Sequence, residues 1–70
     1  MKMPTLKTKI HMFRKERNMQ QAELAALVGV RRETIGNLEN GKYNPSLKLA
    51  MDIAKVFECR VEDIFMFVED

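Results

Sequence analysis

Apolar residues recur along this chain at intervals of three and four, which is the spacing of one face of an α-helix. The first set is Leu6, Ile10 and Phe13, with mostly charged residues between them, and it predicts a helix over residues 6–17. Asn18 comes next in the chain, and asparagine tolerates the left-handed backbone conformation in which many helices end. The pattern therefore predicts a first helix that stops at this asparagine.

Two shorter helices are predicted next, with a glycine between them. The first begins near residue 20 and stops at Gly29, and the second covers residues 31–39 and closes at Asn40 and Gly41. Glycine adopts the positive φ of a tight turn without steric penalty, so Gly29 is expected to turn the chain. The residues expected to point inward are Leu24, Leu27, Val28, Thr34, Ile35 and Leu38.

A fourth and a fifth helix complete the prediction of a single all-α domain over residues 1–70. Ser46 is a favourable N-cap for the fourth helix, because its hydroxyl can accept a hydrogen bond from a free N–H of the first turn. The fifth helix covers residues 61–65 or 61–66. The apolar stripe of the fourth helix consists of Leu49, Met51, Ile53, Ala54 and Phe57.

The end of the chain is too apolar for a free tail. Residues 65–68 read Phe-Met-Phe-Val, and another surface should cover them. Two interpretations stay open. The tail runs as a strand, or it folds back onto the core of its own chain.

The two parts of the chain carry opposite charge. Residues 1–48 hold ten Lys and Arg against four Asp and Glu, a net +6, whereas residues 49–70 hold two against six, a net −4. This asymmetry is typical of a protein with one surface that meets a polyanion. Ordinary solvated faces are the alternative.

Candidate catalytic and metal-binding residues are sparse. Cys59 and His11 are the only cysteine and histidine, so no internal disulfide, metal site or cofactor is expected. No catalytic triad, carboxylate pair or phosphate-binding loop can be assembled, which argues against an enzyme. No apolar run is long enough for a membrane span. We expect a cytoplasmic protein in which Cys59 packs as a small core residue.

The segment over residues 20–39 has the order of a helix-turn-helix. Ala25 is small where two helices must approach closely, and Gly29 permits the turn. Val30 and Ile35 are expected to fill the angle between the helices. An ordinary helical hairpin would share some of these features.

Over about residues 6–65 the sequence resembles the phage-repressor-like, or Cro/C1-type, helix-turn-helix family. Four blocks carry the resemblance, in the family's order and at its separations: QAELA at 21–25, LENGK at 38–42, NPSL at 44–47 and VEDIF at 61–65. The resemblance implies a five-helix, lambda-repressor-like DNA-binding domain, with a short terminal β-ribbon as in members of the cytolysin-operon repressor type. It implies a sequence-specific transcriptional regulator, most simply a repressor that binds a pseudo-palindromic operator on double-stranded DNA.

In this family the helix after the turn enters the major groove, which here would present Arg31, Arg32, Glu33 and Asn37 to the bases. Arginine can bond guanine in bidentate fashion, asparagine can bond adenine, and glutamate can accept from cytosine. We therefore expect Arg32 and Asn37 to be the main base contacts. Two alternatives stay open: these side chains form ordinary solvated surface, or Glu33 orients an arginine instead of touching a base.

The resemblance also implies two contacts with the DNA backbone. Gln21 begins the second helix, where free N–H groups and the helix dipole favour a phosphate. Asn40, Lys42 and Tyr43 would bind phosphate beyond the third helix. Thr34 is expected to contact a phosphate or to pack inward. Together these contacts would fix the angle at which the third helix enters the groove.

Arg14 and Glu39 occupy positions that form a semi-buried ion pair in several family members. Both residue types are present here, so the resemblance implies that the pair ties the first helix to the end of the third. Removing one partner of a well-buried pair costs about 3–5 kcal/mol. Arg14 is therefore expected either to be structural or to contact DNA, and both roles stay open.

Proteins of this kind read two half-sites about one helical turn, ~34 Å, apart, so a homodimer is expected. The dimerisation helix and tail are assigned to residues 61–68, with residues 1–4 pairing with the tail or, alternatively, disordered. An antitoxin-type or restriction-control protein with a protein partner stays an alternative function. The expected dimer interface consists of Val61, Ile64, Phe65 and Phe67.

Overall fold

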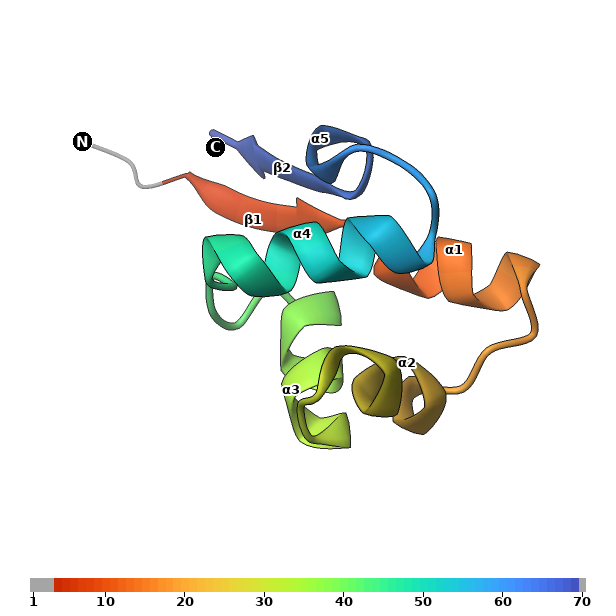
Figure 1. Ribbon diagram of the computed structural model, residues 1–70. Coiled ribbons are helices and arrows are strands. Elements are labelled where there is room, and N and C mark those ends of the chain that lie inside the picture. The colour runs from red at the N-terminus through yellow and green to blue at the C-terminus, as the bar shows by residue number, and fades with distance from the viewer. Residues whose placement is uncertain (1–3, 70) are drawn as a thin grey trace.

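The computed structural model describes residues 4–69 as five helices and a two-stranded antiparallel sheet. In chain order the elements are β1 (Thr5–Thr8), α1 (Ile10–Glu16), α2 (Gln21–Val28), α3 (Arg32–Glu39), α4 (Leu47–Val56), α5 (Val61–Ile64) and β2 (Phe65–Val68). In Figure 1, α4 crosses the middle of the molecule, with β1, β2 and α5 on one side and α2 and α3 on the other. Within the described residues, no helix is long and apolar enough to cross a bilayer.

The first helix predicted from the sequence is too long at its N-terminal end. Residues 5–8 form β1, which pairs with β2 in a register that sets Leu6 opposite Phe67 and Thr8 opposite Phe65. The backbone N–H of Lys9 then donates to the Ile64 carbonyl over 2.8 Å. Leu6 and Ile10 are both buried, so a strand followed by a helix satisfies the same apolar spacing that predicted one continuous helix.

The strand pair confirms the terminal β-ribbon and corrects its N-terminal partner. Within the described residues, the apolar tail pairs with Thr5–Thr8. Pro4 is exposed and outside the strand, and Met1 to Met3 lie outside the described residues. The fifth helix is also shorter than expected, because Phe65 already has the extended backbone of β2.

The core lies where α4 meets the other helices. Among the described residues, the large side chains that are fully buried are Ile10, Leu24, Ile35, Leu38, Ile53, Phe57 and Ile64. Burying each stabilises the fold by about 1.5–3 kcal/mol. Two predicted inward residues are wrong: Leu27 is 62% exposed and Met51 is 55% exposed. Short helices turn only one stripe inward, and these residues lie just outside it.

Several helix ends follow the sequence closely. Asn18 and Gly29 have the expected positive φ, 52° and 74°. The Ser46 hydroxyl accepts a hydrogen bond from the Leu49 N–H at 3.1 Å. At the start of α2, where the N-cap residue Gln20 makes no side-chain capping bond, the Glu23 carboxylate accepts from the Gln20 backbone N–H at 3.2 Å. A residue three positions into the helix thus compensates for part of the missing cap.

Candidate nucleic-acid interface

The turn between α2 and α3 is built by small residues. Ala25 is buried against the neighbouring helix, and its carbonyl accepts a hydrogen bond from the Val30 N–H at 3.0 Å. Gly29 makes the turn in the left-handed conformation. Ile35 is fully buried behind the turn. These contacts fix the angle between α2 and α3, which lie next to each other in the lower part of Figure 1.

The outward face of α3 carries the side chains expected to meet bases. Arg31, Arg32, Glu33 and Asn37 are all exposed. Arg31 lies at the N-cap of α3 and makes no side-chain capping bond, so it does not stabilise the helix start in the usual way. All four side chains are therefore open to a partner, and they offer guanidinium donors, a carboxylate acceptor and an amide that can both donate and accept.

Arg32 is linked to the interior by a chain of hydrogen bonds, which we call the Glu39 network: Arg14, Gln21, Arg32 and Glu39. Arg32 Nη1 donates to Gln21 Oε1 at 3.0 Å, and Gln21 Nε2 donates to Glu39 Oε1 at 3.0 Å. Arg14 Nε donates to Glu39 Oε2 at 2.6 Å, and Arg14 Nη2 donates to Glu39 Oε1 at 3.1 Å. Four side chains from three helices thus hold one another in place.

The ion pair between Arg14 and Glu39 is well buried. Their side chains are 6% and 8% exposed, and Arg14 Nη1 also donates to the Met19 carbonyl at 2.8 Å. Burial by itself would raise the pKa of Glu39, but the hydrogen bonds from Arg14 and Gln21 and the Arg14 charge outweigh it and lower the pKa. Arg14 is therefore structural, and its guanidinium is turned toward the interior.

The residues expected to contact phosphate surround this face. Gln21, the first residue of α2, is half-buried because its amide also joins the Glu39 network. Thr34 is half-buried, which is intermediate between the exposed position of a phosphate contact and the buried position of a core residue. Beyond α3, Asn40, Lys42 and Tyr43 are exposed. The polar residues at the start of α2 and beyond α3 therefore flank the outward face of α3.

Sequence reasoning missed two contacts in this region. The Gln21–Arg32 bond joins residues eleven positions apart, and no local pattern predicts such a bond. The other involves Arg17, which follows α1. Its guanidinium stacks over the rings of Phe13 and Phe57 and donates to the Phe57 carbonyl at 3.1 Å. The four-residue spacing of Phe13 and Arg17 was a usable signal for this stacking.

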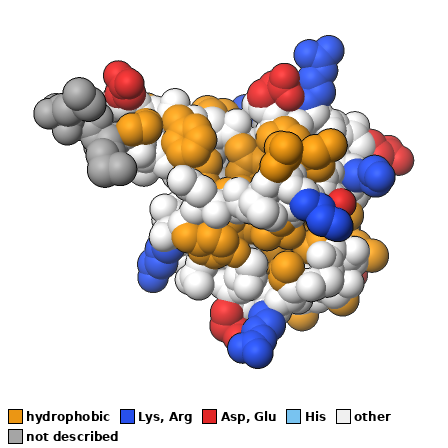
Figure 2. Space-filling view, turned by 60° about the vertical axis from the view of Figure 1, so that its left-hand side comes forward, with side chains coloured by type: hydrophobic (Ala, Val, Ile, Leu, Met, Phe, Trp, Pro, Cys, Tyr) orange, Lys and Arg blue, Asp and Glu red, His pale blue; other side chains and the backbone are white. Residues whose placement is uncertain are grey.

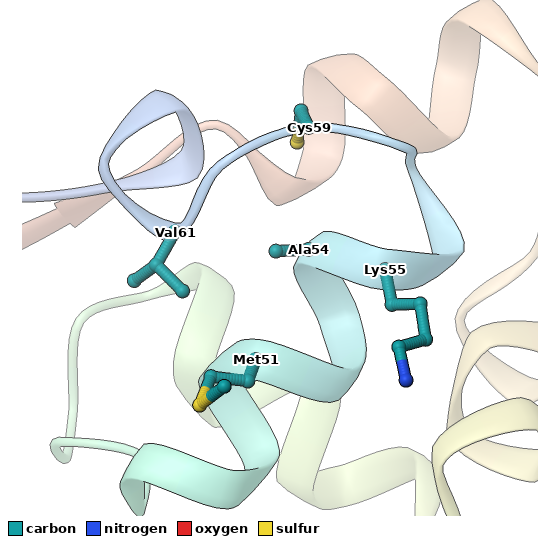
Figure 3. Close-up of a pocket in the computed structure, with 5 residues that line it drawn as sticks. All are labelled: Met51, Ala54, Lys55, Cys59 and Val61. Atoms are coloured by element: carbon teal, nitrogen blue, oxygen red, sulfur yellow. The ribbon is translucent and has the colours of Figure 1, made fainter.

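The surface around Cys59 carries few charged or reactive side chains. The depression in Figure 3 is lined by Met51, Ala54, Lys55, Cys59 and Val61, with Lys55 its only charged side chain. Burial raises the pKa of the Cys59 thiol and Asp63 adds to the effect, while Arg17 opposes it. Cys59 packs against the core as a half-buried residue. Among residues 4–69, no three His, Cys, Asp or Glu side chains group as metal ligands do.

The four residues expected at a dimer interface differ in how far they are exposed to solvent. Ile64 is fully buried and Phe65 is 9% exposed, so both belong to the core of the chain itself. Val61 is half-buried, and Phe67 is 57% exposed. Of the four, only Val61 and Phe67 offer surface to a partner in this conformation.

Comparison with known proteins agrees with this geometry. A family model described as helix-turn-helix matches residues 10–64. A protein of Archaeoglobus fulgidus, described as an uncharacterized HTH-type transcriptional regulator, is 62% identical over 93% of this chain and 92% of its own length. A regulator of Methanocaldococcus jannaschii with the same description is 48% identical over 93% of this chain and 98% of its own length.

Solved structures show the same architecture. The transcriptional regulator VanUg is 25% identical with a TM-score of 0.80, over 96% of this chain and 89% of that one. The P22 c2 repressor, solved with a synthetic operator, is 26% identical with a TM-score of 0.74, over 77% of this chain and 82% of that one. The protein is not an enzyme and belongs to the Cro/C1-type helix-turn-helix family of DNA-binding transcriptional regulators.

Proposed function

We propose that this protein is a homodimeric repressor that binds a pseudo-palindromic operator by inserting α3 into the major groove. The observation that carries the proposal is the outward face of α3, on which exposed Arg32 is held by Gln21. A side chain held before binding loses less conformational freedom on the DNA. The P22 c2 repressor, which has a similar structure, is described in complex with an operator.

Each candidate residue then has a role. Arg32 and Asn37 read bases, with Arg31 and Glu33 beside them at the start of α3. Guanine, adenine and cytosine edges present the donors and acceptors that these side chains match. Backbone phosphates are bound by Gln21, Thr34, Asn40, Lys42 and Tyr43.

The dimer would form through the end of the molecule that carries α5 and β2. Large exposed hydrophobic side chains occur here and on the adjoining part of α4, among them Leu47, Met51 and Phe67. Figure 2 shows hydrophobic side chains gathered on this face. A groove beside them is lined by Leu6, Pro45, Leu47, Val61 and Phe67, among others. Apolar surface of this kind favours a second copy. A regulator of this kind would work beside the chromosome, in the cytoplasm.

Selection of bound sequences from a random DNA pool, with the mass of the complex measured alongside, tests the proposal. We expect an inverted repeat with half-sites about 10 base pairs apart and two protomers bound. A single half-site with one protomer would contradict the dimer. Absence of any enriched sequence would contradict base reading and favour the alternative, a partner protein of the antitoxin or restriction-control kind.

A further inference from the structure

Gly36 lies in the middle of α3, and the packing of the protein itself does not explain it. Glycine within a helix lowers the folding equilibrium constant about fivefold relative to alanine. Gly29 and Gly41 are needed for their positive φ, 74° and 68°, but Gly36 has no such conformation. The backbone at this position would accept any ordinary helical residue.

The space around Gly36 would also accept a side chain. Within 4 Å, a Cβ at this position would meet only the Gln21 amide, with Nε2 at 3.8 Å and Oε1 at 3.9 Å. These distances are ordinary van der Waals contact. An alanine would therefore fit the free protein and stabilise α3, so the space around Gly36 does not require glycine, which leaves room for a reason outside the protein.

The position of Gly36 indicates what that reason is. Residues four apart share one face of a helix, so Gly36 lies in a row between Arg32 and Asn40. Across from it is the amide of Gln21, which binds Arg32. All three neighbours belong to the surface proposed to contact DNA. The gap left by the missing side chain thus lies beside these three residues.

We propose that Gly36 is the point at which the α3 backbone comes nearest to the edges of the base pairs, so that its missing side chain sets how deeply the helix enters the major groove. The inference rests on the proposed function. A methyl group at this point would hold α3 away from the bases and lengthen the hydrogen bonds made by Arg32 and Asn37. Hydrogen bonds weaken steeply when their geometry is lost.

Gly36→Ala tests this inference through two readouts that move in opposite directions. The melting temperature of the free protein should rise by about 4–8 °C. Affinity for the selected operator should fall roughly ten- to hundredfold, as when a methyl group is forced into a packed contact. A residue with a purely structural role would not separate stability from binding in this way.

Glu58→Gly is the matched control. Glu58 has a φ of 55° at the end of α4, so glycine there should also raise the melting temperature. Loss of a negative charge should leave DNA affinity unchanged or slightly higher. If wild type binds the operator and Gly36→Ala binds within twofold of it, or if Gly36→Ala melts lower than wild type, the inference is wrong. If wild type itself selects no DNA sequence, the proposed function fails first, and the inference fails with it.

Discussion

Arg32 Nη1 donates a hydrogen bond to Gln21 Oε1 across 3.0 Å, so a side chain on the outward face of α3 is held by the first residue of α2. The other end of the same amide donates to Glu39. The orientation of Gln21 is thereby fixed, since exchanging its oxygen and nitrogen would break both bonds. The residue proposed to read bases and the residue proposed to bind phosphate are thus linked to each other before DNA binds.

Gln21→Ala should therefore remove more than the proposed phosphate contact, because it also removes the hydrogen bond to Arg32. A phosphate contact carries no sequence information, so its loss alone would weaken binding to all sequences alike. Because Gln21 also holds Arg32, the losses caused by Gln21→Ala and Arg32→Ala should fall short of additivity by about 0.5–1.5 kcal/mol. Binding titrations of both single variants and the double variant on the selected operator measure this coupling.

Lys42→Ala provides the matched control for that cycle. Lys42 is an exposed candidate for a phosphate contact and lies outside the Glu39 network. Its loss should add to that of Arg32→Ala within about 0.5 kcal/mol. Equal additivity for Gln21→Ala would show that the Gln21–Arg32 bond has no part in DNA binding.

Protein stability should depend on the protonation of Glu39. Its folded-state pKa lies below the ordinary value of 4.5, so the folded state holds the carboxylate more favourably than the unfolded chain does. This contribution is complete above the unfolded pKa and is lost as the pH falls through the lower folded pKa. Urea unfolding from pH 7 to pH 3 should show a steeper acid loss for wild type than for Glu39→Gln. Parallel curves would contradict this account of Glu39.

Gly41 should tolerate substitution less well than Gly29. Both have positive φ, so alanine is strained at either site, by about 1–2 kcal/mol. At Gly41 a Cβ would also lie 2.6 Å from the Leu6 carbonyl oxygen, whereas at Gly29 nothing lies within 4 Å. Gly41→Ala should therefore lower the free energy of unfolding by more than Gly29→Ala does. Equal losses for the two variants would mean that β1 moves freely to make room.

The proposed dimer predicts that substitutions at two neighbouring residues of β2 affect self-association differently. Successive residues of a strand point to opposite faces, so Met66 and Phe67 lie on the two sides of the ribbon. Phe67→Ser should weaken self-association by about 2 kcal/mol, roughly thirtyfold, and Met66→Ser should leave it nearly unchanged. Sedimentation equilibrium measures both. A larger effect of Met66→Ser would place the interface on the other face of the ribbon.

The sequence predicts the part of the fold in which local signals agree. Gly29, Asn18 and Ser46 each mark a helix boundary by their own chemistry, and the structure has all three as expected. The strand at residues 5–8 was missed because Leu6 and Ile10 are buried whether the chain between them is helical or extended. Its partner β2 lies about sixty residues away, and no local pattern records such a pairing.

In the candidate site, too, the sequence predicts what local signals determine and misses what depends on contacts between distant residues. The exposure of Arg31, Arg32 and Asn37 follows from helical periodicity and the positions of the buried residues between them. The bond from Arg32 to Gln21 depends on the angle between α2 and α3 and on side-chain rotamers. Ile64 and Phe65 were assigned to a dimer surface because they are apolar, but apolar residues also fill the core, and here they do so.

The central claim is that α3 reads bases through Arg32. Measuring how each base pair of the operator contributes to the affinity of wild type and of Arg32→Ala tests this claim most directly. Wild type and variant are titrated against the selected operator and against all single-base changes of one half-site. Arg32→Ala should lose about 1–3 kcal/mol on the operator and lose its preference at one base pair per half-site, while other preferences persist. A uniform loss across all sequences would mean that Arg32 binds phosphate, and would contradict the claim.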